Sequence, residues 1–425
     1  MMSENKKKRT NKEPINSVKG MRDILDDNFY NYQGFFEKAQ EIAVYYGFKP
    51  IEIPIVEQED LFVASIGIGT DAVDKEMYTL KTKGGDKLAL RPEGTAGVMR
   101  AYIEHGMQSL PQPVMLYYYG PFFRHDNPQR GRYRQFYQFG LEIIGTEKSI
   151  ADALIIKTTM AILEEAGAPN LVVDINSIGD KECRPAYIRE LTNYYKKHIG
   201  ELGAIDRERL KTNPLRILDS KDPKTIAVNE NAPDSVSFLT GDSKKHFKQV
   251  LEYLEEMGVP YRINKNLVRG LSYYTHTVFE VVEIPEDGSA PLTIAGGGRY
   301  DYLAKSLGSK KDVPAMGVAI GVDRVIESMW CEKMCPRISK KPKMYFIQLG
   351  FDAKLKSLGV IEILRKAKVP IAQSLSKDSI GAQLATAEKL GMKYTLIFGQ
   401  KEALENSVIV RDMASRSQDT VKLSK

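Results

Sequence analysis

The spacing of apolar residues along the chain predicts a strand-rich first part with helices on its flanks. Between residues 28 and 46, apolar side chains recur every three or four positions, which predicts an amphipathic helix that ends at Gly47. Helices are also predicted after Thr95 and from Ser149 to Ala166. Strands are predicted at 87–91, 114–124, 132–144, 276–283, 291–295 and 316–320. Short connections between neighbouring strands favour an antiparallel sheet, so the expected fold class is α+β.

The pattern changes twice further along the chain. Residues 176–258 are polar and helical in pattern, so we expect a helical insertion there, between core segments at 18–175 and 259–330. Residues 331–341, "CEKMCPRISKK", read as a linker. From "KMYFIQLG" to "YTLIFG" strand and helix patterns alternate, which predicts a small α/β domain with a largely parallel sheet at 342–425.

Charge and composition narrow the class of protein. The net charge of +6 is unevenly placed: residues 342–425 hold 14 Lys and Arg against 8 Asp and Glu, and residues 1–12 hold five against one. Basic ends suit a polyanionic partner such as nucleic acid, and a solubilising surface explains them equally well. Residues 1–17 are expected to be a disordered basic tail. The three cysteines, and the lack of an apolar run long enough to cross a bilayer, favour the cytoplasm.

Familiar nucleotide and metal motifs do not explain the chain. "GIGTDA" at 67–72 has the glycine spacing of a dinucleotide-binding loop but lacks its context, because a buried strand does not precede it. The Walker phosphate loop does not occur in the sequence. "CEKMC" lacks zinc spacing and has no nearby histidine, so no metal site is assigned. An ATP site in this chain must therefore use other residues.

The segment "FRHDNPQRGRYRQFYQFGLEIIG" has one chemically rich face. Alternate residues of a strand share a face, and the odd positions from 133 to 143 are mostly apolar. The even positions are Arg132, Arg134, Phe136, Gln138, Gly140 and Glu142. A solvated face is the commoner explanation of such alternation, but it rarely includes Phe and Gly. Together with Arg124 on the preceding strand, this face suits a nucleoside triphosphate, because arginines fork onto phosphates and a ring can stack on a base.

Three other segments carry candidate site residues. In "LRPEGTAG" Thr95 is the expected N-cap of a helix, while Glu93 could bind an amino group or pair with the helix dipole. In "GVAIGVDRV" Arg324 follows a strand and could cover the face of a base. "LVRGLSYYTH" puts Arg269 near two tyrosines. Strict alternation would place Arg269 and Tyr274 on opposite faces, so a bulge or turn is expected at Gly270.

These segments resemble those of a known enzyme class. "GFKPIEIPIV", "FRHD…GRYRQF" and "GVAIGVDR" resemble motifs 1, 2 and 3 of the class II aminoacyl-tRNA synthetases. "LRPEGTAG", "GRYRQFYQFGLEIIG", "LVRGLSYYT" and "AGGGRYDYL" resemble the histidyl-tRNA synthetases within that class, and the similarity runs from about Gly20 to the C-terminus. "YTLIFGQKEALENSVIVRDM" resembles that family's anticodon-binding domain.

The resemblance implies an activity and its partners. Histidine and ATP would form histidyl-adenylate, with Mg²⁺ accompanying ATP, and the histidyl group would pass to the 3′ end of tRNA(His). The family is homodimeric, and the segment around Pro54 would lie at the interface. The resemblance also names the site residues: Arg269 and Arg124 for catalysis; Glu93, Thr95, Gln138, Glu142, Tyr273 and Tyr274 for histidine; Arg124, Arg132, Phe136 and Arg324 for ATP; Gln129 for the acceptor end of the tRNA.

The chain departs from the family's usual wording at three positions. Ser272 and His276 stand where aspartate and glycine are expected, and His276 is read as a strand residue rather than a catalyst. Asn127 replaces an arginine that helps to read the tRNA acceptor end. The rival interpretation is a non-catalytic, histidine-binding regulatory subunit of ATP phosphoribosyltransferase. Such a subunit lacks the C-terminal domain and usually loses catalytic positions, whereas this chain has residues 342–425 and keeps Arg124, Arg269 and Arg324.

Overall fold

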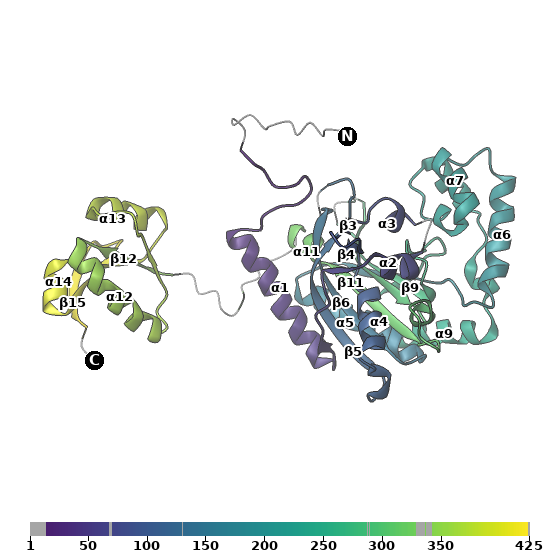
Figure 1. Cartoon of the computed structure of the whole chain (residues 1–425), viewed down its shortest axis with the longest axis horizontal. Coiled ribbons are helices and arrows are strands. Elements are labelled where there is room, and N and C mark those ends of the chain that lie inside the picture. The colour runs from purple at the N-terminus through teal and green to yellow at the C-terminus, as the bar shows by residue number, and fades with distance from the viewer. Residues whose placement is uncertain are drawn as a thin grey trace. The chain divides into compact units, whose positions relative to one another are not determined.

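The computed structural model describes residues 14–67, 70–129, 131–286, 288, 290–328, 336 and 342–423. The chain divides into two compact units, residues 1–336 and 337–425 (Figure 1). The first 13 residues of the predicted tail, and the predicted linker apart from Pro336, lie outside the described residues.

The first unit is built on an eight-stranded sheet. Its strands, in spatial order, are β1 (Lys49–Pro50), β5 (Val114–Phe123), β6 (Gln135–Ile144), β11 (Ala315–Gly321), β10 (Leu292–Arg299), β9 (Thr275–Glu283), β7 (Leu171–Ser177) and β8 (Tyr261–Ile263). The five central pairings are antiparallel, and only the outer pairs β1–β5 and β7–β8 are parallel. The predicted antiparallel sheet is therefore confirmed.

One face of the sheet is covered by helices. The helices α1 (Asp26–Tyr45), α5 (Ser149–Glu165) and α9 (Gly241–Glu256) share a buried apolar cluster with this face. On β6 the odd residues Phe139, Leu141 and Ile143 belong to that cluster, as the period-two pattern predicts. The even residues of β6 consequently point to the other face, which is free to carry a site.

A smaller three-stranded sheet stands beside the main one. It consists of β2 (Val56–Gln58), β4 (Lys87–Leu90) and β3 (Thr79–Lys81), with α2 (Glu59–Ile66) and α3 (Asp71–Asp74) nearby. The stretch "FKPIEIPIVE" reads as a single strand interrupted by Pro54, whereas the structure has two short strands, β1 and β2, in different sheets. Proline has no N–H to donate to a ladder, which fits a break in pairing between them.

The chain between β7 and β8 is helical. It contains α6 (Arg184–Lys197), α7 (Ala204–Thr212), α8 (Pro223–Asn229) and α9, with short 3₁₀ turns at Pro214–Ile217 and Ser235–Phe238. In Figure 1, α6 and α7 lie at the end of this unit away from α1. By contrast α9 packs on α5, and its Phe247, Val250 and Leu254 join the core of the sheet.

The second unit is a small α/β domain. Its strand order is β13 (Ile371–Gln373), β12 (Met344–Gln348), β14 (Tyr394–Phe398), β15 (Ser407–Asp412) and β16 (Gln418–Lys422). Its helices are α12 (Phe351–Lys366), α13 (Ile380–Lys389) and α14 (Gln400–Glu405). The expected α/β alternation is present, but the sheet is mixed: β12 pairs in parallel with β13 and β14, while β15 and β16 add two antiparallel pairings.

Candidate active site

A cavity of about 280 Å³ lies in the first unit and is lined by residues of β6, β9, β10 and β11. It brings together residues that are up to 231 positions apart in the chain, from Glu93 to Arg324. Ten of the twelve residues predicted for the site line it: Glu93, Thr95, Arg124, Arg132, Phe136, Gln138, Arg269, Tyr273, Tyr274 and Arg324. The other two, Glu142 and Gln129, do not.

Glu93 caps the helix α4 (Thr95–Glu104) at one end of the cavity. Its carboxylate accepts hydrogen bonds from the backbone N–H groups of Thr95 at 2.7 Å and Ala96 at 2.9 Å, and from the hydroxyl of Tyr273 at 3.3 Å. The prediction that Thr95 is the N-cap is wrong, because Thr95 is already the first helical residue and Glu93 satisfies the free N–H groups. Burial raises the pKa of the Glu93 carboxyl.

Glu142 lies directly behind this end of the cavity and is fully buried. Its Oε1 accepts hydrogen bonds from the hydroxyls of Thr95 at 2.9 Å and Tyr118 at 3.4 Å, and its Oε2 accepts one from Tyr300. Burial raises the pKa of Glu142 to about 8, despite these donors. Sequence reasoning missed Tyr118 and Tyr300, although both stand in segments that it singled out as a strand and a family motif.

The segment that carries Arg269 is a series of turns rather than a strand. Gly270 lies at a bend, which confirms the change of direction expected there. As a result Arg269, Tyr273 and Tyr274 all line the cavity. The two tyrosine rings are 4.7 Å apart between centroids, and the Arg269 guanidinium carbon is 5.6 Å from the centre of the Tyr274 ring.

The opposite end of the cavity is basic, with Arg124, Arg132, Arg269 and Arg324 in its lining. Nε of Arg124 donates to the carbonyl of Pro92 at 2.8 Å, which places its guanidinium carbon 5.4 Å from the centre of the Phe136 ring. Arg324 belongs to α11 (Val322–Glu327), and burial lowers its pKa, as does the neighbouring Arg132. These cations are close enough to favour an anionic ligand.

The carboxylates at this basic end were also not predicted from the sequence. Asp126 pairs with Arg132, and Glu280 pairs with Arg269. Asp323, at the start of α11, is 2% exposed and accepts hydrogen bonds from Arg22 at 2.8 Å, from Tyr32 and from a β6 backbone N–H. "GVDR" contains this aspartate, but its partners lie 186 to 301 positions away, so the sequence alone gives no signal for the contact.

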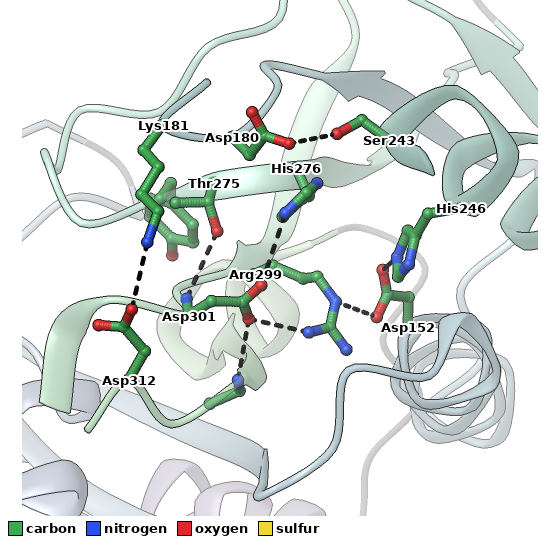
Figure 2. Close-up of polar contacts among 12 residues, drawn as sticks. Asp152, Asp180, Lys181, Ser243, His246, Thr275, His276, Arg299, Asp301 and Asp312 are labelled. Carbon is green, nitrogen blue, oxygen red and sulfur yellow. Dashed lines mark hydrogen bonds and ion pairs between the residues drawn. The ribbon is translucent and has the colours of Figure 1, made fainter. Parts of the chain in front are cut away.

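His276 belongs to a polar cluster that does not line the cavity (Figure 2). It lies in β9, as predicted, with Nε2 3.7 Å from Asp301. Arg299, 1% exposed, donates to Asp301 and Asp152 at 2.8 Å each, and His246 contacts Asp152 at 2.8 Å. The backbone of His276 is left-handed, with φ of 47°, which explains why a glycine is expected at this position.

Neither a preformed metal centre nor a membrane span is found in the part of the chain that the structure describes. Within the described ranges, no three His, Cys, Asp or Glu side chains gather in a way that could hold a metal ion. None of the helices there is long and apolar enough to cross a bilayer.

An antiparallel sheet that holds an arginine-lined cavity, followed by a small α/β domain, is the architecture of a class II aminoacyl-tRNA synthetase. A family model described as histidyl-tRNA synthetase matches residues 20–325, and one described as an anticodon binding domain matches residues 343–425. The chain belongs to the histidyl-tRNA synthetase family.

Individual proteins agree with the family models. A histidine–tRNA ligase of Dehalococcoides mccartyi is 42% identical over 407 residues, which cover 96% of this chain and 97% of the relative. The crystal structure of apo S. aureus histidyl-tRNA synthetase matches with a TM-score of 0.77 at 33% identity, over 96% of this chain and 98% of that one.

A third match bears on the rival interpretation. A Bacillus halodurans protein described as an ATP phosphoribosyltransferase regulatory subunit/histidyl-tRNA synthetase matches with a TM-score of 0.62 at 22% identity, over 88% of this chain and 97% of that one. At that identity the likeness concerns the fold alone. The anticodon-binding domain at residues 343–425 favours a catalytic synthetase over a regulatory subunit.

Proposed function

We propose that this cavity is where the enzyme, a histidine–tRNA ligase, activates histidine with ATP. The enzyme forms histidyl-adenylate and transfers the histidyl group to the 3′ end of tRNA(His). The observation that carries the assignment of the site is that one cavity gathers the buried carboxylate of Glu93, with buried Glu142 behind it, and four arginines. An amino acid and a nucleoside triphosphate, placed end to end, have the complementary charges.

The carboxylate end is suited to the α-ammonium group of histidine. Glu93 and Glu142 are both buried, burial raises the pKa of each, and the charge of Glu93 further raises the pKa of Glu142. A bound cation would lower the free-energy cost of ionising these carboxyls, because an opposite charge nearby favours the ionised form. We assign the ammonium group to Glu93, with the hydroxyl of Thr95 and the side-chain amide of Gln138 beside it.

The imidazole ring is assigned to Glu142 and Tyr274, with Tyr273 alongside. Neutral imidazole offers one N–H donor and one acceptor, so a carboxylate and a hydroxyl can satisfy both nitrogens. Glu142 is covered, and its longest hydrogen bond is the one from Tyr118, at 3.4 Å. We infer that the ligand N–H takes the place of this hydroxyl on Oε1 and so brings Glu142 into the site.

The arginine end is assigned to ATP. Phe136 and Arg324 would enclose the adenine ring, Arg132 would hold the outer phosphates, and Arg124 the α-phosphate. The histidine carboxylate attacks the α-phosphorus, the bond to the β-phosphate oxygen breaks, and pyrophosphate leaves. Arg269 neutralises the charge that develops between carboxylate and α-phosphate. Preorganised donors of this kind supply much of the rate in such transfers.

Mg²⁺ is proposed to enter as a partner of ATP rather than as a resident ion. Asp126, Glu280 and Asp323 are each paired with an arginine, so no free cluster of carboxylates is found among the described residues that line the cavity. Mg²⁺ is commonly held by substrate phosphates, water and one or two carboxylates, and such an ion fits here. When bound, it would neutralise charge on the departing pyrophosphate.

The remaining assignments concern tRNA and assembly. Gln129 and the loop around Asn127 are assigned to the tRNA acceptor end, and the basic unit 342–425 to the anticodon region. We also propose a homodimer with the segment around Pro54 at its interface, and a cytoplasmic location. The divisions at 18–175, 176–258, 259–330 and 331–341 are retained as the proposed domain plan.

Amino-acid-dependent ATP–pyrophosphate exchange tests the proposed function. The full-length enzyme, assayed without tRNA against all twenty amino acids, should exchange only with histidine. Exchange driven by another amino acid would overturn the assignment of the carboxylate end. Absence of exchange, in a preparation that binds tRNA(His), would overturn the assignment of the cavity as the activation site.

A further inference from the structure

Arg269 is held by a carboxylate that sequence reasoning did not single out. Its Nη1 forms an ion pair with Oε1 of Glu280 on β9. The other oxygen of Glu280, Oε2, accepts a hydrogen bond at 3.0 Å from the hydroxyl of Thr293 on the neighbouring strand β10. Because both oxygens of the carboxylate are engaged, its orientation is fixed. The side chains of Arg269 and Glu280 are 20% and 25% exposed, and both line the cavity.

The backbone of β10 completes this arrangement. Gly296 stands opposite Glu280 in the β9–β10 ladder. A Cβ atom at position 296 would lie 2.5 Å from Nη2 of Arg269, so a larger residue there would displace the guanidinium from the sheet. Nε of Arg269 is buried and has no hydrogen-bond partner among the described residues. One edge of the guanidinium is thus anchored to the strand.

The anchor matters because Arg269 comes from a turn segment rather than from a strand. Its neighbours therefore lack the regular ladder of hydrogen bonds that fixes a strand residue, and a long arginine side chain has several rotatable bonds. Ordering a mobile guanidinium during the reaction costs conformational free energy, which a guanidinium that is already in place does not require. Glu280 and Thr293 belong to adjacent paired strands, which gives the arginine a rigid support.

We propose that Glu280 is a positioning residue for histidine activation: with Thr293, it holds the Arg269 guanidinium where the histidine carboxylate and the α-phosphate meet. This inference rests on the proposed role of Arg269. Glu280 acts through Arg269 and does not touch the reacting atoms. Its removal should slow the chemical step much more than it weakens the binding of histidine, because the ammonium and imidazole groups of histidine are assigned to other residues.

A double-mutant cycle in the full-length enzyme tests the coupling. Single-turnover formation of histidyl-adenylate is measured for the wild type, Glu280→Gln, Arg269→Ala and the double variant, with the KM for histidine taken from exchange assays. Glu280→Gln should lower the single-turnover rate roughly 10-fold, within the range for residues in direct contact, and change the KM for histidine less than about 3-fold. In the Arg269→Ala background the same substitution should cost less than about 2-fold.

Two further variants serve as controls. Glu283→Gln makes the same chemical change three residues along β9, outside the cavity, and should leave the rate unchanged. Thr293→Val removes the hydroxyl that orients Glu280, keeps the side-chain shape and should lower the rate by about 3-fold. It supplies a second test if Glu280→Gln does not fold, which thermal unfolding of each variant will reveal.

Three outcomes would overturn the proposal. An equal loss in the wild-type and Arg269→Ala backgrounds, relieved by added Mg²⁺, would make Glu280 a metal ligand. A faster rate with a lower KM for ATP would mean that Glu280 opposes the binding of the phosphates. An unchanged rate in both Glu280→Gln and Thr293→Val would leave it without a role. Failure of the proposed function is distinguishable, because the wild type itself would then show no histidine-dependent exchange.

Discussion

Histidine binding should release a proton from Glu142. Burial raises the pKa of this carboxyl to about 8. At pH 7.5 such a group holds about three-quarters of a proton, whereas free imidazole, with an ordinary pKa of about 6.5, holds about a tenth. If the imidazole N–H is donated to Glu142, the carboxyl must ionise. The expected release at Glu142 is therefore about three-quarters of a proton for each histidine bound.

Isothermal titration calorimetry in buffers of different ionisation enthalpy measures this number. Glu142→Gln removes the titrating group, and the difference between the wild type and the variant isolates its share from any proton lost by Glu93. The variant should also bind histidine about 10- to 150-fold more weakly, since a hydrogen bond to a charged group contributes about 1.5–3 kcal/mol. Glu147→Gln, at an exposed position nearby, should match the wild type in both measurements.

The raised pKa of Glu142 also predicts how the stability of the protein without bound histidine depends on pH. The folded-state pKa of Glu142 is raised above its ordinary value of 4.5, so its contribution to stability is full below pH 4.5 and is lost as the pH rises through about 8. Each pH unit in this window removes up to about 1.4 kcal/mol. Relative to the wild type, Glu142→Gln should therefore gain stability from pH 5 to pH 8. Equal proton release and parallel stability profiles in the two proteins would refute the reasoning.

Two other predictions address catalysis and the departure at position 276. Arg269→Ala should lower the single-turnover rate of adenylation by about 10²–10³-fold without unfolding the protein. Arg269→Lys should restore only part of this rate, because a point charge does not fork across carboxylate and phosphate. A wild-type rate in the alanine variant would contradict the assigned role. Burial lowers the pKa of His276, and neighbouring Asp301 only partly opposes this shift. The folded protein therefore loses stability as the pH falls below about 6.5, where His276 is protonated in the unfolded chain. His276→Gly, which also suits the left-handed backbone, should flatten the loss of stability between pH 7.5 and 5.5 in denaturant unfolding, while exposed His105→Gln should not; identical profiles for both variants would contradict the assignment to His276.

Local periodicity was enough to predict the cavity face of β6. One face of this strand is buried against helices, so the period of two indicates which residues face the site, and Phe136 and Gln138 both line the cavity, although Tyr137 on the other face reaches it as well. The same logic fails at Thr95. Its hydroxyl is used by Glu142, 47 positions away, and the longer side chain of Glu93 reaches the free N–H groups of α4 instead.

Contacts between distant segments account for the other omissions. Glu280 stands among apolar residues in "VFEVVE", which reads as an ordinary strand. Its importance depends on the pairing of β9 with β10 and on the path of the turn that delivers Arg269. Neither is encoded in local spacing. Tyr118 and Tyr300 were missed for the same reason, since each becomes notable only through its contact with the buried carboxylate of Glu142.

Glycines in the central strands offer a sequence signal for such contacts. A Cβ atom at Gly296 would meet Arg269 at 2.5 Å, one at Gly298 would meet the ring of Tyr274 at 2.8 Å, and one at Gly317 would meet Glu142 at 1.7 Å. Glycine weakens a strand, so its repeated use in β10 and β11 indicates close approach by other groups. "AGGGR" and "AMGVAIG" therefore mark where long side chains from a turn and a neighbouring strand cross the sheet. Gly296→Ala should accordingly impair adenylation through Arg269, although position 296 itself contributes no functional group.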